Sequence, residues 1–153
     1  MPLRGPPTHV DLSVSDPDLS IPFYRALFES LGYQRLDIAA ADFQGAQPRR
    51  AAWQVLLDSG ASFGVEVRPS SGPDRERVSD RYAPGLHHMA FHAESAADVD
   101  RVHQAMLAAG ANVLDPPADY SGQRGYSQGY YAAFYADPDR IKIEVAYIPG
   151  ANP

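Results

Sequence analysis

The sequence predicts an α+β fold in which two tandem β-α-β-β-β modules form a single domain, residues 1–153. Residues 9–14 alternate strictly between polar and apolar side chains, as a half-buried strand does, and an apolar stripe with helical spacing follows. The same order of patterns begins again near residue 86. Twelve glycines and fourteen prolines in 153 residues favour short elements joined by many turns.

The first module is expected to span about residues 7–68. Its opening strand, residues 9–14, has one apolar face, because side chains alternate along a strand. A helix follows, and Ser20 is its expected N-cap because Pro22 fits comfortably only in the first turn of a helix. Gly32 is expected to end this helix. Three strands are expected after it, near residues 33–38, 50–57 and 62–68.

The second module is expected to span about residues 85–148, after a polar linker at residues 69–84. Residues 86–92 are expected to form its first strand. Residues 95–98 resemble a capping box that starts a helix, and Gly110 is expected to end that helix. Short strands follow near residues 112–114, 130–136 and 140–147.

The composition excludes several classes of protein. Thirteen basic against nineteen acidic residues give a net charge of −6, which argues against a nucleic-acid-binding protein. The absence of cysteine excludes disulfides, zinc fingers, iron–sulfur clusters and a thiol nucleophile, so any metal must be held by His, Asp or Glu. No apolar run approaches the ~20 residues that span a bilayer, and the first residues lack the apolar core of a signal peptide. We expect a cytoplasmic protein with no membrane partner.

Two His/Glu pairs occupy matching positions in the two modules. His9 and Glu66 lie 57 residues apart, and His88 and Glu144 lie 56 residues apart. Each pair joins the first and the last strand of its module, so a pseudo-two-fold relation between the modules could bring the four side chains together. His87 competes with His88 at this stage, because a shift of one residue exchanges the two faces of a strand.

Two imidazoles and two carboxylates suit one divalent ion, for which Zn, Ni, Co, Mn and Fe(II) are candidates. Such an ion would polarise a carbonyl or enediolate oxygen of a small-molecule substrate. Glu66 and Glu144 are also candidate general bases. The alternative interpretation is structural: each histidine is a hydrogen-bonded strand residue, and each glutamate is solvated or paired with Arg or Lys.

Three further residues are candidates for contact with a substrate. Residues 120–131 are rich in Gly and Tyr, and one interpretation makes them a mobile lid in which Tyr130 stacks on substrate and Arg124 meets an anion. The other interpretation is a surface loop whose tyrosines pack on the edge of the domain. Trp53 is a candidate for the core, for the lining of the site, or for an aromatic contact with substrate.

Four segments together resemble the vicinal oxygen chelate superfamily, which includes glyoxalases, bleomycin-resistance proteins, fosfomycin-resistance enzymes, extradiol dioxygenases and methylmalonyl-CoA epimerases. The resemblance covers nearly the whole chain and is carried by residues 9–16, 20–24, 85–91 and 134–144. It implies that the paired modules form a cupped, partly open barrel. It also implies a homodimer as the expected assembly, because many members are dimers that share sites between subunits.

The resemblance also implies roles for individual residues. His9, Glu144 and His88, rather than His87, match metal ligands of the family, and Glu66 matches the remaining ligand. Members with a facial triad would use only His9, His88 and Glu144. One departure is Arg140, which follows Asp-Pro-Asp where the family usually has glycine, and it leads us to expect an altered turn.

The function expected first is that of a divalent-metal-dependent enzyme of the glyoxalase type, a lyase or isomerase. Its substrate would be a small molecule chelated through adjacent oxygens. One alternative is a metal-free protein that sequesters a drug, as bleomycin-resistance proteins do, and the net negative charge suits a cationic ligand. Another is an Fe(II) dioxygenase of the extradiol type, although most of these have about twice this length.

Overall fold

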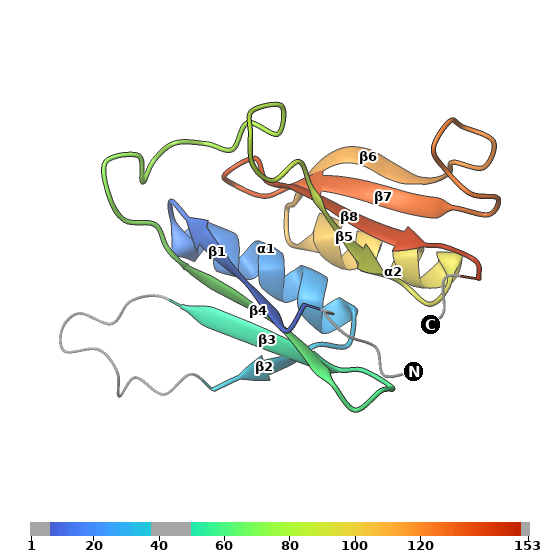
Figure 1. The fold of residues 1–153 in the computed structure, drawn as a ribbon, viewed down its shortest axis with the longest axis horizontal. Coiled ribbons are helices and arrows are strands. Elements are labelled where there is room, and N and C mark those ends of the chain that lie inside the picture. Colours follow the sequence, from blue (N-terminus) through green and yellow to red (C-terminus); the bar gives the residue numbers. More distant parts are fainter. Residues whose placement is uncertain (1–6, 38–49, 151–153) are drawn as a thin grey trace.

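The computed structural model describes residues 7–37 and 50–150, and within them each module has the predicted order of elements. The first module contains β1 (His9–Val14), α1 (Pro17–Ser30), β2 (Gln34–Leu36), β3 (Ala51–Leu56) and β4 (Ser62–Pro69). The second contains β5 (Met89–His92), α2 (Ala96–Ala108), β6 (Asn112–Asp119), β7 (Tyr131–Ala136) and β8 (Lys142–Tyr147). The α+β fold of two repeated modules is thereby confirmed (Figure 1). Residue 38, the last of the strand expected at 33–38, lies outside the described residues.

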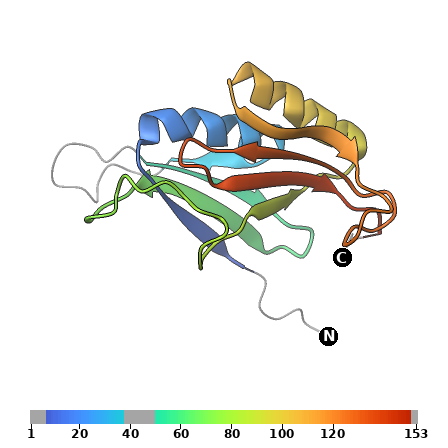
Figure 2. The ribbon, with the colours of Figure 1, turned by 90° about the horizontal axis from the view of Figure 1, so that it is seen from above.

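Each module forms its own four-stranded sheet, and the two sheets have equivalent strand orders. The orders are β1-β4-β3-β2 and β5-β8-β7-β6, with the first and last strand of each module paired in parallel. Both helices lie on the same side of the sheets (Figure 2), so the opposite side, the open face, presents strands alone. Neither α1 nor α2 is long and apolar enough to cross a membrane.

The main core lies between the helices and the sheets and continues from one module into the other. Phe28 of α1 is completely buried, and its ring centroid lies 5.4 Å from that of Trp53 in the same module. On its other side it lies 5.2 Å from Phe91 of the second module, in an edge-to-face contact. Phe28 therefore joins the two modules through aromatic packing.

The start of α1 differs from the expectation that Ser20 caps it. Asp16 is the N-cap: its carboxylate accepts a hydrogen bond of 2.9 Å from the backbone N–H of Asp18, and Pro17 occupies the first helical position. The helix continues through Pro22. Ser20 is fully buried, and its hydroxyl has no hydrogen-bond partner among the described residues. The expectation that Ser20 is the N-cap was therefore wrong. Asp16 and Pro17, which come earlier in the chain, provide the capping side chain and the first helical residue.

Strand β6 is longer than the expected strand at residues 112–114. It reaches Asp119 and includes Pro116 and Pro117, with two shifts of register against β7. Proline cannot donate a hydrogen bond to a neighbouring strand, and β6 tolerates two prolines because it is the outermost strand of its sheet. The expected strand ended before Pro116 and Pro117, whereas the structure includes both in an edge strand.

The turn between β7 and β8 connects the second module to the first. The hydroxyl of Tyr24 in α1 donates a 2.8 Å hydrogen bond to Asp137, and the backbone N–H of Ser15 donates one of 2.8 Å to Asp139. Both carboxylates are buried, at 3% and 5% exposure. Burial, with a smaller contribution from Asp139, raises the pKa of Asp137 from 3.8 to about 6.

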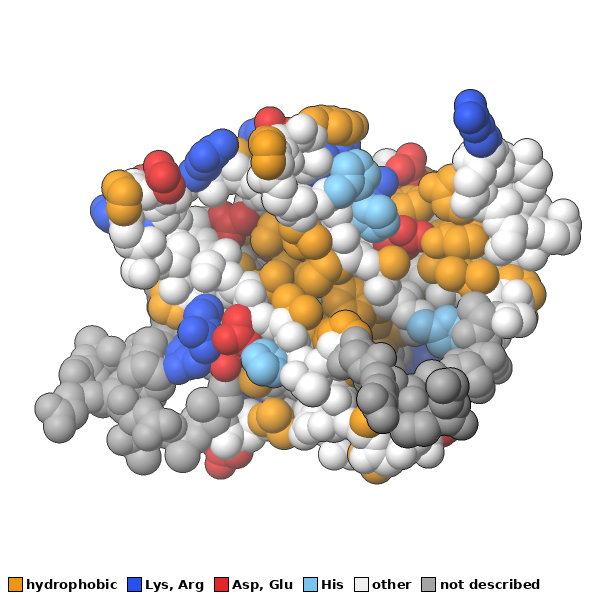
Figure 3. All heavy atoms as spheres, viewed as in Figure 1, with side chains coloured by type: hydrophobic (Ala, Val, Ile, Leu, Met, Phe, Trp, Pro, Cys, Tyr) orange, Lys and Arg blue, Asp and Glu red, His pale blue; other side chains and the backbone are white. Residues whose placement is uncertain are grey.

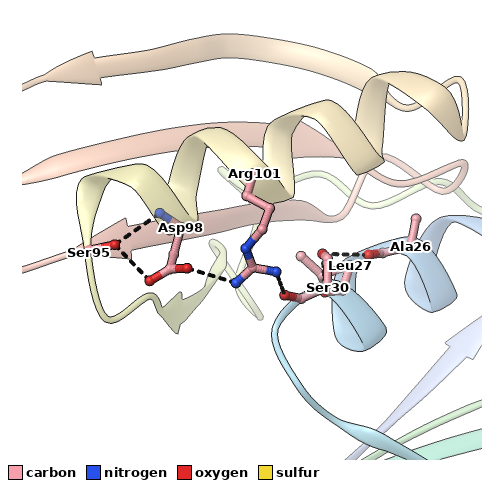
Figure 4. A network of polar contacts seen from close by, with 6 residues as sticks. All are labelled: Ala26, Leu27, Ser30, Ser95, Asp98 and Arg101. Atoms are coloured by element: carbon pink, nitrogen blue, oxygen red, sulfur yellow. Dashed lines mark hydrogen bonds and ion pairs between the residues drawn. The ribbon is translucent and has the colours of Figure 1, made fainter.

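A second contact between the modules lies where the two helices meet (Figure 4). Arg101 of α2 donates a 2.6 Å hydrogen bond to the backbone carbonyl of Ser30 in the last turn of α1, and a 2.8 Å hydrogen bond to Asp98. Asp98 in turn pairs with the N-cap Ser95, as the capping-box interpretation expected. The last turn of α1 contains no basic residue, so Arg101 supplies the positive charge that stabilises it.

Arg140 has the backbone conformation of a glycine. Its φ is +66°, which makes it the one non-glycine residue with positive φ in the described part of the chain. The turn is closed by a 2.9 Å hydrogen bond from Arg140 N–H to Asp137 C=O, and β8 pairs with β7 without a register shift. The expectation of an altered turn was therefore wrong: the turn is kept and the arginine is strained.

We expect Arg140→Gly to raise the free energy of unfolding by up to about 1 kcal/mol. A left-handed backbone costs an L-residue about 1–2 kcal/mol, and the greater freedom of glycine in the unfolded chain offsets part of that gain. Chemical denaturation of the two proteins would measure the difference. Arg140→Ala keeps the strain and should not stabilise, so equal stabilisation by alanine and glycine would contradict this explanation.

Candidate functional site

The two predicted glutamates occupy equivalent positions in the two sheets. Glu66 lies opposite Asp11 across the parallel β1–β4 pair, and Glu144 lies opposite Ala90 across the parallel β5–β8 pair. In each module the residue opposite the glutamate lies two positions after the predicted histidine, His9 or His88. The repeat seen in the sequence spacing thus extends to the hydrogen-bonded register of the strands.

Glu144 and His88 lie together on the open face. The carboxylate of Glu144 is 3% exposed, and its Oε2 lies 3.2 Å from Nε2 of His88. The Tyr130 hydroxyl donates a 2.5 Å hydrogen bond to Oε1 of the same carboxylate. His88 is therefore the histidine that contacts Glu144. His87 contacts His88 instead, with their Nδ1 atoms 2.7 Å apart. One buried carboxylate therefore has an imidazole on one oxygen and a phenol on the other.

Tyr130 stays protonated at neutral pH. Burial first, and then the hydrogen bond and the charge of Glu144, raise the pKa of its phenol. A protonated phenol donates to Oε1 of Glu144 and leaves Oε2 as the oxygen that can exchange a proton with another group. The side chain of His88 is 36% exposed, so this oxygen lies close to the surface of the open face.

Glu66 has different surroundings. Its carboxylate forms ion pairs with Arg50 and, at 3.1 Å, with Arg68. Arg68 also pairs with Asp11 at 3.0 Å. His9 is exposed, and its Nδ1 lies 3.1 Å from the Thr8 hydroxyl. The first module therefore holds its glutamate in an arginine network, and the two glutamates of the repeat are not chemically equivalent.

The two His/Glu pairs do not meet within one chain. Across residues 7–37 and 50–150, no three His, Cys, Asp or Glu side chains are grouped closely enough to hold one metal ion. Figure 3 shows the open face with histidine side chains in separate places rather than in one cluster. The His88–Glu144 pair supplies two neighbouring donor atoms, and a complete centre would need donors from elsewhere.

The remaining candidates lie in three different environments. Trp53 is completely buried on the helix side of the first sheet, where Phe28 packs against it, and so lies away from Glu66. Arg124 is exposed in the loop that precedes β7. That loop is held by hydrogen bonds of 2.7 Å from Gly129 N–H to Ser121 Oγ and from Ser121 N–H to Asp119. These bonds favour the fixed-loop interpretation, although Tyr130 of the same loop does face Glu144.

The sequence analysis allowed an Arg or Lys partner for each glutamate but did not identify which residues these are. Arg50 and Arg68 neutralise Glu66, and only the position of Arg68, two residues along the same strand, was a signal in the sequence. The tyrosines of residues 120–131 were expected to pack on the domain edge or to stack on substrate, and their grouping with Phe134 beside Glu144 was not predicted. Away from the glutamates, a hollow of about 480 Å³ lies beside β2 and β3. Its lining includes Gln34, Leu36, Gln54 and Leu56.

A model of the Glyoxalase/Bleomycin resistance protein/Dioxygenase superfamily matches residues 7–145. A Bacillus subtilis (strain 168) protein, the uncharacterized protein YqjT, is 30% identical over 139 residues, which cover 90% of this chain and 94% of YqjT.

Solved structures of similar fold include a glyoxalase candidate from Bacillus halodurans, with a TM-score of 0.67 and 25% identity over 94% of this chain and 96% of that one. A glyoxylase/bleomycin resistance protein/dioxygenase domain from Frankia sp. EAN1pec has a TM-score of 0.61 and 24% identity over 95% and 98% of the two chains. TioX from Micromonospora sp. ML1 has a TM-score of 0.56 and 22% identity over 94% and 98%. At these identities, the similarity to the Frankia domain and to TioX shows only that the fold is shared.

Proposed function

Because this chain belongs to the Glyoxalase/Bleomycin resistance protein/Dioxygenase superfamily, we propose that it is a divalent-metal-dependent enzyme of the glyoxalase type. Its substrate would be a small molecule chelated through adjacent oxygens, and its reaction that of a lyase or isomerase. The observation that carries the proposal is the buried Glu144 carboxylate with His88 Nε2 at 3.2 Å on the open face. The equivalent register of His9 and Glu66 supports it.

The four proposed ligands form two separate pairs, and each pair could supply half of the ligands of one metal ion. His88 and Glu144 are neighbours, whereas His9 and Glu66 lie in the other sheet, and Glu66 is already paired with two arginines. We propose that a homodimer completes the centre, with one pair from each subunit. A divalent ion held by the two pairs would supply Lewis-acid polarisation of the substrate oxygens.

In this proposal Glu144 is the general base. After leaving the metal ion, its Oε2 would take the proton from a carbon next to a carbonyl group and return it to the neighbouring carbon. Tyr130 would orient the carboxylate by donating to Oε1, because its raised pKa keeps the phenol protonated. Glu144→Gln keeps the size of the side chain and removes the base, so we expect turnover to fall by at least about 100-fold. A fully active Glu144→Gln variant would contradict the assignment.

Elemental analysis of protein purified without added metal or chelator tests the metal centre. We expect about one divalent ion per chain in the unmodified protein and its loss in His88→Ala. His92→Ala is the matched control, because His92 is exposed and ends β5, which begins at Met89 and so, unlike the strand expected at residues 86–92, does not include His88. Absence of metal even after addition of Ni, Co, Mn, Zn or Fe(II) would contradict the proposal.

Mixing two inactive variants tests the shared site. His9→Ala and His88→Ala each damage a different half, so a mixed dimer would contain one centre with all four ligands intact. Recovery of metal binding and activity in the mixture, and not in either variant alone, is the expected result. If mixing restores nothing while dimers still exchange subunits, the centre is not shared between subunits.

A second candidate function is metal-free binding of a small molecule. The ion pairs of Glu66 with Arg50 and Arg68 favour it, because a carboxylate neutralised by two guanidinium groups is a poor ligand for a cation. This candidate predicts tight binding of a small molecule by protein that takes up no metal. The elemental analysis described above separates it from the enzyme.

A further inference from the structure

A group of aromatic rings, the aromatic corner, stands beside Glu144 on the open face. Its members are Tyr120, Tyr126, Tyr130 and Phe134. The rings of Tyr120 and Phe134 are nearly perpendicular, with an 88° angle and centroids 5.6 Å apart. Those of Tyr126 and Tyr130 meet at 75° and 4.8 Å, and Tyr120 and Tyr126 lie 5.1 Å apart. Edge-to-face contact is the ordinary geometry of packed aromatic pairs, and the face of such a ring attracts a cation.

One ring of the corner already carries an ammonium group. The Nζ atom of Lys142 lies 4.1 Å from the centroid of the Phe134 ring. This is well within the distance at which the negative face of an aromatic ring attracts a cation. Lys142 and Phe134 lie on adjacent strands of the same sheet. The corner is therefore a surface on which a positive charge is stable in this protein.

The charges around the corner are also complementary to a cation. Phe134 lies directly opposite Glu144 across β7 and β8, and Tyr130 touches the Glu144 carboxylate. Burial raises the pKa of Tyr120, and the charges of Asp115 and Glu144 add to that effect. Burial disfavours a charge of either sign, and it is only the negative charges of Asp115 and Glu144 that favour a cation here. The net charge of −6 acts in the same direction at longer range.

The corner is held in shape by the loop that carries it. Gly129 has a φ of +79°, and a Cβ atom added there would lie 2.6 Å from Cγ of Pro149. The Ser121–Gly129 hydrogen bond and the bond from Tyr120 N–H to Tyr130 C=O close the loop. The rings are thus positioned before any ligand arrives, which lowers the entropy cost of binding.

We propose that the aromatic corner binds the alkylated ammonium group of a small organic cation. The inference goes beyond the proposed function, because it requires no metal and holds for an enzyme as well as for a binding protein. The occupant is a small cation rather than a neutral aromatic ring, because a lysine ammonium already lies on one of the rings and the buried Glu144 carboxylate touches another. The ligand would bind by attraction to the ring faces and to Glu144.

Choline and its uncharged isostere 3,3-dimethyl-1-butanol test the inference, since they differ in charge and hardly in shape. Calorimetric titration of the full chain, as purified and after EDTA treatment, would compare them. We expect choline to bind at least about tenfold more tightly than the alcohol, the ratio that corresponds to a cation–π contribution of about 1.4 kcal/mol. Equal binding of the two, or binding of neither, would overturn the proposal.

Variants of Tyr126 and Lys142 make the test specific. Tyr126→Phe keeps the ring and should keep choline binding, whereas Tyr126→Leu should weaken it about tenfold. Tyr131→Leu is the matched control, because Tyr131 lies on the other side of β7 with its hydroxyl bonded to Asp100, and it should bind choline normally. Lys142→Met removes a competing positive charge and should tighten binding. Normal binding by Tyr126→Leu, or weaker binding by Lys142→Met, would contradict the inference.

Glu144 belongs both to the surroundings of the corner and to the proposed metal centre, so the two sites are tested by separate measurements. Choline binding after EDTA treatment tests the aromatic corner, and elemental analysis tests the four proposed ligands. Protein that holds metal but does not distinguish choline from the alcohol would refute the corner and leave the proposed enzyme in place. Protein that binds choline but never a metal ion would support the corner and contradict the metal-dependent function.

Discussion

Replacing Phe28 with alanine is expected to lower the free energy of unfolding by about 3–5 kcal/mol, the usual cost of removing a buried aromatic ring from a core. Phe28 is completely buried and contacts both Trp53 of its own module and Phe91 of the other. Its loss would leave a cavity between the modules, at the place where the rings of Trp53 and Phe91 now contact it. Both modules are therefore expected to lose stability together.

Urea denaturation followed by circular dichroism would measure this effect. Leu19→Ala is the matched control, because Leu19 belongs to the same helix and is 62% exposed. The control is expected to change stability by no more than about 0.5 kcal/mol. A Phe28→Ala variant that is as stable as the unmodified protein would contradict the role given to this ring.

Replacing Asp137 with asparagine is expected to stabilise the protein at pH 7, by on the order of 2–3 kcal/mol, and to change little at pH 4. The folded state raises the pKa of this carboxyl from 3.8 to about 6, mainly by burial. Between pH 4 and 6 the folded protein therefore binds more protons than the unfolded chain, and this group's contribution to stability falls as pH rises. Asparagine stays neutral, accepts from Ile141 N–H through its oxygen and can donate to Tyr24 through its amide.

The measurement is the difference in unfolding free energy between Asp137→Asn and the unmodified protein at a series of pH values from 4 to 7. The difference should grow with pH and level off above about pH 6. Asp74→Asn, at an exposed position, is the control and should show no such growth. A constant difference across the range would mean that Asp137 does not titrate there, and the explanation from burial would fail.

Much of the fold follows from the sequence because local patterns determine it. The alternation in β1 and the glycines after both helices follow from local geometry, and Gly32 and Gly110 do adopt the positive φ that ends a helix. The N-cap of α1 was harder to predict, because two polar residues compete and burial decides between them. Ser20 is buried in the packed domain, and no local pattern reveals that.

The sequence predicted which residues belong to the candidate site, but it did not predict which of them contact one another. Spacing pointed to Glu144 and to His87 or His88, the family resemblance selected His88, and the structure brings His88 and Glu144 to 3.2 Å. Spacing cannot reveal that Glu66 has Arg50 as a partner, since sixteen residues and a turn separate them. Nor can it fix the distance between the two sheets, which depends on how Phe28, Arg101 and the Asp-Pro-Asp turn hold the modules together.

The hydrogen bonds of that turn also bear on how the chain folds as it is synthesised. Ser15 and Asp139 are 124 residues apart, and Tyr24 and Asp137 are 113 apart. The last strand of the first module ends at Pro69. The partner of its buried Tyr24 hydroxyl, Asp137, is added to the chain only 68 residues later. Until then the nascent first module has an unpaired polar group in its core, which costs about 1–3 kcal/mol. We therefore expect it to stay loosely packed during most of translation and to reach its final form only with the last strands.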